Sequence, residues 1–146
     1  MAGFVVDASV AVKWLVSEAH SDKAAALLDG KNTLAAPELM FVEATNALWA
    51  LARRGEIKNA DVMEAVDVLA DTPVAVPLTA RQLLPSAAKL ASDLDHPVYD
   101  CVYLALSMHT EHPVVTADRR FYEKTKNHPY LSARVVHISD LDGGTA

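Results

Sequence analysis

The sequence has few of the features that mark secreted, metal-stabilised or membrane-spanning proteins. Its 146 residues include one cysteine, Cys101, so no disulfide can form within the chain and no cysteine-ligated zinc or iron–sulfur centre is expected. No stretch approaches the roughly 18 uninterrupted apolar residues that a membrane span needs. The N-terminus has neither the basic residues nor the long apolar run that direct secretion. We expect a cytoplasmic protein without a membrane anchor.

Glycine and proline are also scarce, at 5 and 7 residues, and they are scattered along the chain. The sequence therefore has no linker rich in these residues, and it shows no internal repeat or low-complexity tract. A chain of this length buries roughly two-thirds of the surface that its unfolded form exposes, which is enough for a hydrophobic core. We expect one domain over residues 1–141 and a short polar tail over residues 142–146.

Positive charge is in short supply, with 13 Lys and Arg against 19 Asp and Glu and a net charge of −6. This balance argues against non-specific binding of nucleic acid over the whole surface. A local basic strip, or a phosphate bridged to the protein by a metal, is still compatible with it.

Short apolar runs alternate with longer segments of helical periodicity. The runs predict strands at Phe4–Val6, Leu34–Ala36, Val74–Val76, Val114–Thr116 and Arg134–Ile138. Helices are predicted at Ser9–Leu15, His20–Leu28, Pro37–Arg53, Asn59–Ala70, Thr79–Asp93, Val98–His109 and Asp118–Lys124. Pro37 is expected in a first helical turn and Gly55 just after a helix end. Because parallel strands need crossovers, this alternation predicts a three-layer α/β/α domain around a five-stranded, mainly parallel sheet.

Two acidic residues follow predicted strands. Asp7 comes directly after Phe4–Val6, and Asp118 comes just after Val114–Thr116. In open α/β sheets, ligands bind outside the carboxyl ends of the strands where the strand order reverses. In a 3-2-1-4-5 order the reversal lies between the first and fourth strands, so Asp7 and Asp118 would flank this crevice.

A third acidic residue, Glu43, lies in a predicted helix that is apolar on nearly every side. Such a helix is expected to be mostly buried. An unpaired buried carboxylate is costly unless a cation or strong hydrogen-bond donors lie beside it, and no Lys or Arg lies within one turn of Glu43. The sequence therefore predicts another group that neutralises Glu43.

The fourth acidic residue, Asp100, lies in the first turn of another apolar helix, where the helix dipole favours a carboxylate. Each of the four acids has an ordinary structural explanation when it is taken alone. Together, and without basic partners nearby, they indicate a hard divalent cation, because clustered carboxylates repel one another unless a cation binds their oxygen atoms. We expect Mg²⁺ or Mn²⁺.

The strings around these acids resemble the PIN-domain ribonucleases. The strings are Val6–Ser9, Pro37–Leu48, Tyr99–Leu106 and Val115–Phe121. Together they span essentially the whole chain, and they are similar, more narrowly, to the toxins of type II VapBC toxin–antitoxin pairs. The resemblance implies a Rossmann-like domain with the strand order 3-2-1-4-5. It also implies metal-dependent cleavage of RNA by water, which leaves 5′-phosphate and 3′-hydroxyl ends.

The resemblance also implies which residues carry the reaction. The metal ligands and catalytic residues would be Asp7, Glu43, Asp100 and Asp118, with Mg²⁺ or Mn²⁺ as the cofactor. Many PIN domains carry a further acid shortly after the last aspartate, whereas this chain has two arginines there.

Three polar residues near the acids are candidates for a supporting role. Ser9 and Thr116 lie beside Asp7 and Asp118, and Asn46 lies one helical turn after Glu43. Their side chains can hydrogen-bond a carboxylate or a water molecule. Helix capping by Ser9 and turn chemistry at Thr116 explain those two residues equally well.

Basic residues near two of the acids are candidates for contacts with RNA phosphates. Arg119, Arg120 and Lys124 follow Asp118, and Arg53 lies at the end of the Glu43 helix. A solvated helix face explains such charges about as well. The family resemblance further implies a homodimer and a groove that receives the C-terminal segment of an antitoxin.

Other functions fit the residues less well. A phospho-receiver domain would need adjacent acids after the first strand and an acid after the third, and this chain has neither. The six histidines show no metal-ligand spacing and are expected to be structural or on the surface. A PIN domain that binds RNA without cleaving it, and a DNA nuclease, remain as alternatives.

Overall fold

The protein is described by a computed structural model over residues 2–142. The strands are β1 (Gly3–Val6), β2 (Thr33–Ala35), β3 (Val74–Ala75), β4 (Val114–Thr116) and β5 (Val135–His137). The helices are α1 (Ala8–Leu15), α2 (Ser21–Ala26), α3 (Glu38–Arg53), α4 (Asn59–Ala70), α5 (Ala80–Leu94), α6 (Val98–Thr110) and α7 (Arg119–Lys126), with a 3-10 turn η1 (Ile138–Asp140). All strand pairs are parallel, in the order β3-β2-β1-β4-β5. The predicted fold class and strand order are confirmed.

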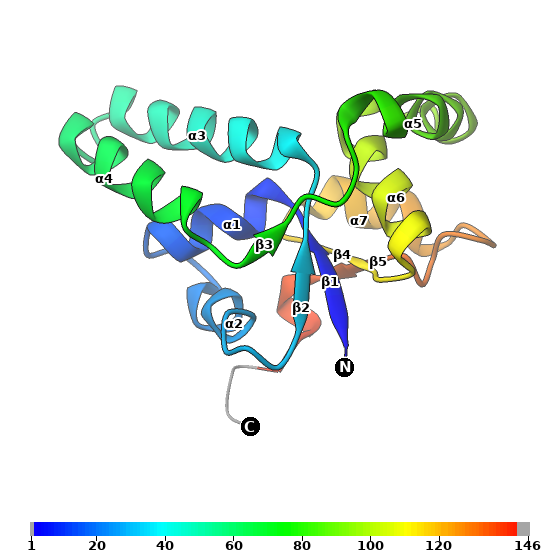
Figure 1. Cartoon of the computed structure of the whole chain (residues 1–146), viewed down its shortest axis with the longest axis horizontal. Helices are drawn as coiled ribbons and strands as arrows, with labels where there is room; N and C mark the ends of the chain where they lie inside the picture. The colour runs from blue at the N-terminus through cyan, green and yellow to red at the C-terminus, as the bar shows by residue number, and fades with distance from the viewer. Residues whose placement is uncertain (1, 143–146) are drawn as a thin grey trace.

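The helices pack in two groups around this sheet. Helices α1, α3 and α4 contact one another, and α5 packs along α6. Figure 1 shows the first group on the left and α5, α6 and α7 on the right. Because the chain runs outward from β1 to β3 and then returns to β4, right-handed crossovers put the two groups on opposite faces of the sheet. The end of β1 therefore lies where the two groups meet.

Several element boundaries differ from the predicted ones for local reasons. Helix α2 begins only after His20, whose φ of 67° lies in the left-handed region. Pro37 is the N-cap of α3 rather than part of its first turn, and Asp118 is the N-cap of α7. The last strand ends before Ile138, which opens a 3-10 turn. Gly55 has a φ of 79° just beyond α3, as predicted for a glycine at a helix C-terminus.

The core is centred on β1, β4 and α6. Every residue of α6 from Cys101 to Ser107 is buried. Helix α3, in contrast, is not mostly buried as its sequence suggests: Met40, Ala44 and Leu48 form one buried stripe, while Val42 and Trp49 are 67% and 54% exposed. A helix with apolar residues on all sides does not reveal from sequence which side meets the core.

The described elements span Gly3 to Asp140, which lies within the predicted domain of residues 1–141. Of the predicted tail, only Asp142 belongs to the described residues. None of the helices within residues 2–142 has the length and apolar character required to cross a membrane.

Candidate metal centre

The topology brings the first and last of the predicted acids to neighbouring strand ends. Strands β1 and β4 pair in parallel, with Val6 beside Val115. Asp7 therefore leaves β1 next to the end of β4, and its backbone N–H donates to the Val115 carbonyl at 3.1 Å. Asp118 lies two residues beyond β4, at the start of α7. Both carboxylates lie at the carboxyl edge of the sheet, where its strand order reverses.

Two hydroxyl groups join these strand ends. Ser9 and Thr116 both donate to Oδ2 of Asp7, Thr116 at 2.9 Å. Each hydroxyl also accepts a backbone N–H from the β4–α7 connection, Ser9 from Ala117 at 2.9 Å and Thr116 from Asp118 at 3.0 Å. Since Asp7 is only 5% exposed, these bonds compensate part of the cost of burying its charge. Ser9 lies inside α1 and is not its N-cap, which is Asp7.

Glu43 reaches this region from α3. Its Oε1 accepts a hydrogen bond of 2.6 Å from the hydroxyl of Tyr103 on α6. The same hydroxyl accepts the backbone N–H of Ala8 at 3.3 Å. Sequence reasoning missed Tyr103, although its position three residues after Asp100 puts it on the same side of a helix.

Asp100 lies in the first turn of α6, as predicted. Its Oδ2 lies 2.6 Å from Nε2 of His96, whose ring stacks on Phe121 at a centroid distance of 5.8 Å. Sequence reasoning treated all histidines as structural or surface residues and overlooked this one. The available signal was the four-residue spacing from His96 to Asp100.

Asp118 is held by the first turn of α7. Its Oδ1 accepts the backbone N–H groups of Arg120 at 2.9 Å and Phe121 at 3.3 Å. This is N-capping by an aspartate, which satisfies two of the N–H groups that a helix start leaves without partners.

The four acids affect one another electrostatically. Burial is the largest cause that raises the pKa of Asp7, to about 6, and the negative charges of Asp100 and Glu43 raise it further, while the bonds from Ser9 and Thr116 lower it. Burial and the charge of Asp100 also raise the pKa of Glu43. Burial and the charge of Asp118 raise the pKa of Asp100, against the effect of His96. The cluster therefore resists carrying its full negative charge without a cation.

Each carboxylate uses one oxygen for hydrogen bonds and leaves the other without a partner among residues 2–142. The bonded atoms are Oδ2 of Asp7, Oε1 of Glu43, Oδ2 of Asp100 and Oδ1 of Asp118. No Lys or Arg of the described chain forms an ion pair with these four acids. Within the same residues no three acidic, histidine or cysteine side chains are already spaced to coordinate one ion. Hard oxygen donors with few cationic partners nevertheless match what Mg²⁺ or Mn²⁺ requires.

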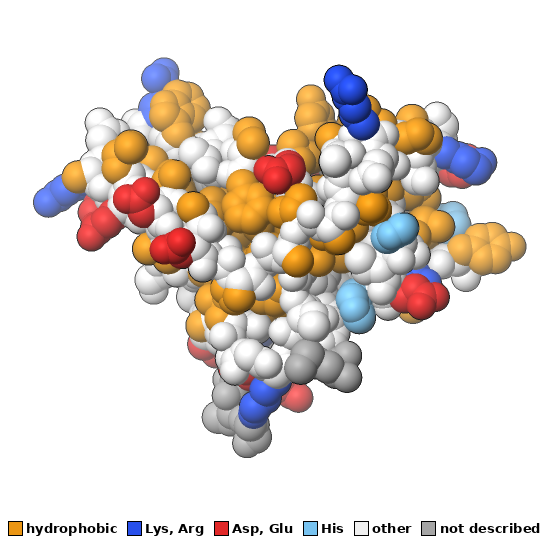
Figure 2. Space-filling view, in the orientation of Figure 1, with side chains coloured by type: hydrophobic (Ala, Val, Ile, Leu, Met, Phe, Trp, Pro, Cys, Tyr) orange, Lys and Arg blue, Asp and Glu red, His pale blue; other side chains and the backbone are white. Residues whose placement is uncertain are grey.

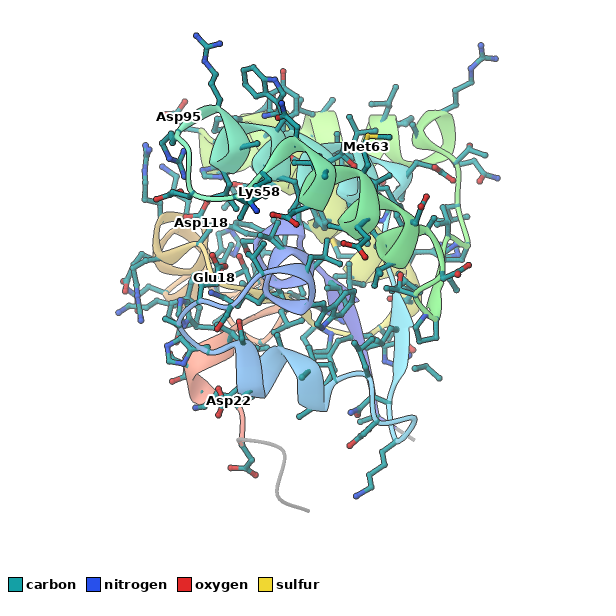
Figure 3. All side chains as sticks on the ribbon, turned by 90° about the vertical axis from the view of Figure 1, so that its left-hand side faces the viewer. Glu18, Asp22, Lys58, Met63, Asp95 and Asp118 are labelled. Atoms are coloured by element: carbon teal, nitrogen blue, oxygen red, sulfur yellow. The ribbon has the colours of Figure 1, made fainter. Side chains whose placement is uncertain are left out.

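Two of the four predicted RNA-contact residues border the acids. A cleft of about 540 Å³ between the α5–α6 connection and α7 is lined by Asp100 and Asp118 together with Arg120 and Lys124. Figure 3 labels Asp118 and Asp95, which line opposite sides of this cleft. The other two predicted residues do not line it: the guanidinium of Arg119 lies 5.9 Å from the Tyr122 ring centre, and that of Arg53 lies 5.6 Å from the Trp49 ring centre.

The supporting role predicted for Asn46 stays a prediction. The Asn46 side chain lies on the exposed outer face of α3, and no hydrogen bond joins it to another described residue. The three-residue spacing places Asn46 and Glu43 on neighbouring positions of the helix surface, with Asn46 on the more exposed side.

The sequence model of the PIN domain matches residues 4–127. The chain belongs to the PIN domain family. This PIN domain is 30% identical over 121 residues to ribonuclease VapC3 of Pyrobaculum aerophilum, a match that covers 82% of this chain and 92% of that protein. The match puts the chain among the VapC-type members of the family.

Two solved structures share the fold of this PIN domain. PAE2754 of Pyrobaculum aerophilum superimposes with a TM-score of 0.69 at 24% identity, covering 94% of this chain and 90% of that one. VapC20 of Mycobacterium tuberculosis, a toxin that cleaves the sarcin–ricin loop, superimposes with a TM-score of 0.65 at 17% identity, covering 90% and 98%. At these identities the likeness establishes the common architecture.

Proposed function

We propose that this PIN domain is a metal-dependent endoribonuclease, the toxin of a VapBC-type pair. The observation that carries the proposal is the arrangement of Asp7, Glu43, Asp100 and Asp118. One oxygen of each carboxylate accepts hydrogen bonds, and the other has no partner among the described residues. No lysine or arginine of the described chain forms an ion pair with these acids. The similarity to a ribonuclease over 82% of the chain supports the same activity.

These four acids would hold Mg²⁺ or Mn²⁺, which in such sites activates water and stabilises the negative charge of the reacting phosphate. The hydrogen bonds from Ser9, Thr116 and the α7 backbone keep the acids oriented before any substrate arrives. Such preorganisation lowers the reorganisation needed during reaction. Attack by water on the phosphorus, with breakage of the bond to the 3′-oxygen, would leave RNA products with 5′-phosphate and 3′-hydroxyl ends.

The chain's own cations would orient the RNA. Arg120 and Lys124 line the cleft beside Asp100 and Asp118, so a strand entering this cleft meets positive charge next to the acids. Contacts of this kind bind phosphates without selecting a base sequence. The cleft is also lined by Asp95 and Glu123, so these two cations would act locally, and they would contribute affinity without selecting bases.

The proposed function includes two protein partners, an antitoxin and a second copy of this chain, within the cytoplasm. Apolar side chains exposed on the surface support such assembly, because monomers rarely expose large contiguous apolar patches. Val42 and Trp49 share the outer face of α3, and Met63 and Val68 are exposed on α4. Figure 2 shows apolar side chains gathered over α3 and in the notch between α3 and α5.

The function is tested by RNA cleavage with purified protein. A panel of structured and single-stranded RNAs is incubated with Mg²⁺, Mn²⁺ or EDTA, beside the variants Asp7→Asn, Asp100→Asn and Asp67→Asn. We expect cleavage with metal, none in EDTA, and a loss on the order of 100-fold or more in the first two variants. Asp67 is exposed on α4 and serves as the matched control, with activity unchanged.

End-group analysis of the products completes the test. Products with 5′-phosphates support attack by water, whereas 2′,3′-cyclic phosphates would show that the RNA attacks itself and would contradict the mechanism. Equal cleavage by wild type, Asp7→Asn and Asp100→Asn would reveal a contaminating nuclease. RNA binding without cleavage in either metal would favour a PIN domain that only binds RNA.

A further inference from the structure

Tyr103 is a polar residue in the most hydrophobic part of the molecule. It lies in the middle of α6 and is 0% exposed. Among residues 2–142 it has the largest of the fully buried side chains. A phenylalanine would fill the same space without bringing a hydroxyl group that must be satisfied. The hydroxyl therefore calls for an explanation beyond packing.

The Tyr103 hydroxyl joins three elements that are distant in sequence. From α6 it donates to Oε1 of Glu43 on α3 at 2.6 Å. It accepts the N–H of Ala8, the first residue of α1, at 3.3 Å. Ala8 directly follows Asp7, so one phenol oxygen fixes the position of Glu43 relative to the end of β1.

Glu43 has few other restraints. It lies on the half-exposed side of α3, and Tyr103 is its hydrogen-bond partner among residues 2–142. A glutamate side chain loses substantial rotamer freedom when it is fixed. Without the Tyr103 hydroxyl, the Glu43 carboxylate would sample several rotamers, and its second oxygen would no longer be fixed relative to the end of β1.

We propose that Tyr103 is a positioning residue for the metal centre, acting through Glu43: its hydroxyl holds Oε1 so that Oε2 is presented to the cation. This inference rests on the proposed function, because it assumes that Glu43 is a metal ligand. Hydrogen bonds to metal ligands from surrounding residues typically contribute 10-fold to 100-fold in metal affinity or activity. The Tyr103 hydroxyl contributes to metal affinity only through its hydrogen bond to Glu43. This contribution therefore disappears when Glu43 can no longer bind the cation.

The test is a double-mutant cycle with Mn²⁺ affinity as the readout. Isothermal titration calorimetry measures Mn²⁺ binding to wild type, Tyr103→Phe, Glu43→Gln and the double variant, without RNA. We expect Tyr103→Phe to weaken Mn²⁺ binding by about 10-fold. In the Glu43→Gln background the same substitution should change affinity by less than about twofold, because coupled residues are not additive.

Two further variants serve as controls. Tyr130→Phe removes the same hydroxyl from a side chain that is 85% exposed, and it should leave Mn²⁺ affinity unchanged. Asp7→Asn probes the metal centre independently of Glu43. Thermal unfolding of every variant confirms that the proteins are folded, and kcat and KM for RNA are measured in parallel. A positioning role lowers kcat and leaves KM for RNA nearly unchanged.

The outcomes separate this inference from the proposed function. If Glu43→Gln and Asp7→Asn weaken Mn²⁺ binding but Tyr103→Phe does not, the role of Tyr103 is refuted and the metal centre stands. If Tyr103→Phe weakens binding equally with and without Glu43, the hydroxyl acts through the fold and the inference is again wrong. If wild type binds no Mn²⁺, the metal centre itself is refuted together with this role.

Discussion

Asp7 shows at the scale of one residue what it costs to bury a carboxylate. Its side chain is 5% exposed, and burial raises its pKa from 3.8 to about 6. Between these two values the folded chain binds a proton that the unfolded chain has lost. The free energy of unfolding therefore falls as the pH rises through this window, and the loss remains in full above it. We therefore expect ionised Asp7 to destabilise the metal-free protein at neutral pH.

Replacing Asp7 by asparagine should therefore stabilise the metal-free protein. The asparagine side chain carries no charge, but its oxygen can still accept hydrogen bonds from the hydroxyl groups of Ser9 and Thr116. At pH 8 in EDTA we expect Asp7→Asn to raise the free energy of unfolding by up to about 3 kcal/mol, since one pKa unit corresponds to about 1.4 kcal/mol. Urea unfolding between pH 4 and pH 8 measures this difference, which should shrink toward zero at pH 4.

Metal provides the control for this prediction. A bound ligand raises the free energy of unfolding, and this increase grows with the logarithm of the ratio of ligand concentration to Kd. Because Asp7→Asn should bind Mn²⁺ more weakly, saturating Mn²⁺ should stabilise wild type more than the variant. A variant that is less stable than wild type at pH 8 in EDTA, or a difference that does not change with pH, would contradict the account given for Asp7.

At the scale of elements, the start of α7 has one side chain, Asp118, that caps the helix and that also belongs to the proposed metal centre. Asp118 caps the helix through Oδ1 and borders the cleft with Asp100. Asparagine also caps helices well, whereas alanine does not. Asp118→Asn should therefore keep the stability of the protein and reduce kcat on the order of 100-fold. Asp118→Ala should lose the same activity and in addition about 1 kcal/mol of stability.

Chemical denaturation and RNA cleavage, measured on the same preparations, separate the two tasks. Thr79→Ala is the matched control, because Thr79 caps α5 by accepting the Gln82 N–H at 3.2 Å and lies outside the cleft. It should lose about 1 kcal/mol and keep its activity. If Asp118→Asn retains full activity, the negative charge of Asp118 is not needed for catalysis.

The elements also show what the sequence could predict. The alternation of valine-rich runs and helical segments predicts the parallel sheet, because parallel strands need crossovers, whereas the strand order is implied by the resemblance to PIN domains. The acids could be placed at strand ends because Asp7 directly follows the first strand and Asp118 lies two residues after the fourth. Tyr103 and His96 could not be found in this way, since their importance depends on side chains brought together from α3, α6 and α7. The exposure of Trp49 likewise depends on which side of α3 meets the core.

At the scale of the whole molecule, the net charge and the proposed substrate have the same sign. A chain with a net charge of −6 repels RNA at long range, so binding must rely on local cations. Arg120 and Lys124 provide these beside the acids. Each phosphate contact with single-stranded RNA releases counterions and adds about 0.7 to the slope of log affinity against log salt. The salt dependence of binding therefore counts the cations that contact RNA.

We expect Arg120→Ala and Lys124→Ala each to raise KM for RNA about fivefold and to reduce the salt slope by about 0.7, with kcat nearly unchanged. Lys31→Ala removes an exposed cation from the turn before β2 and should affect neither quantity. Cleavage kinetics at several concentrations of KCl, with Mg²⁺ held constant, give both values. If all three variants show the wild-type slope, RNA does not enter through this cleft. If Lys31→Ala shifts the slope as much as the other two, the effect comes from overall charge and not from contacts beside the acids.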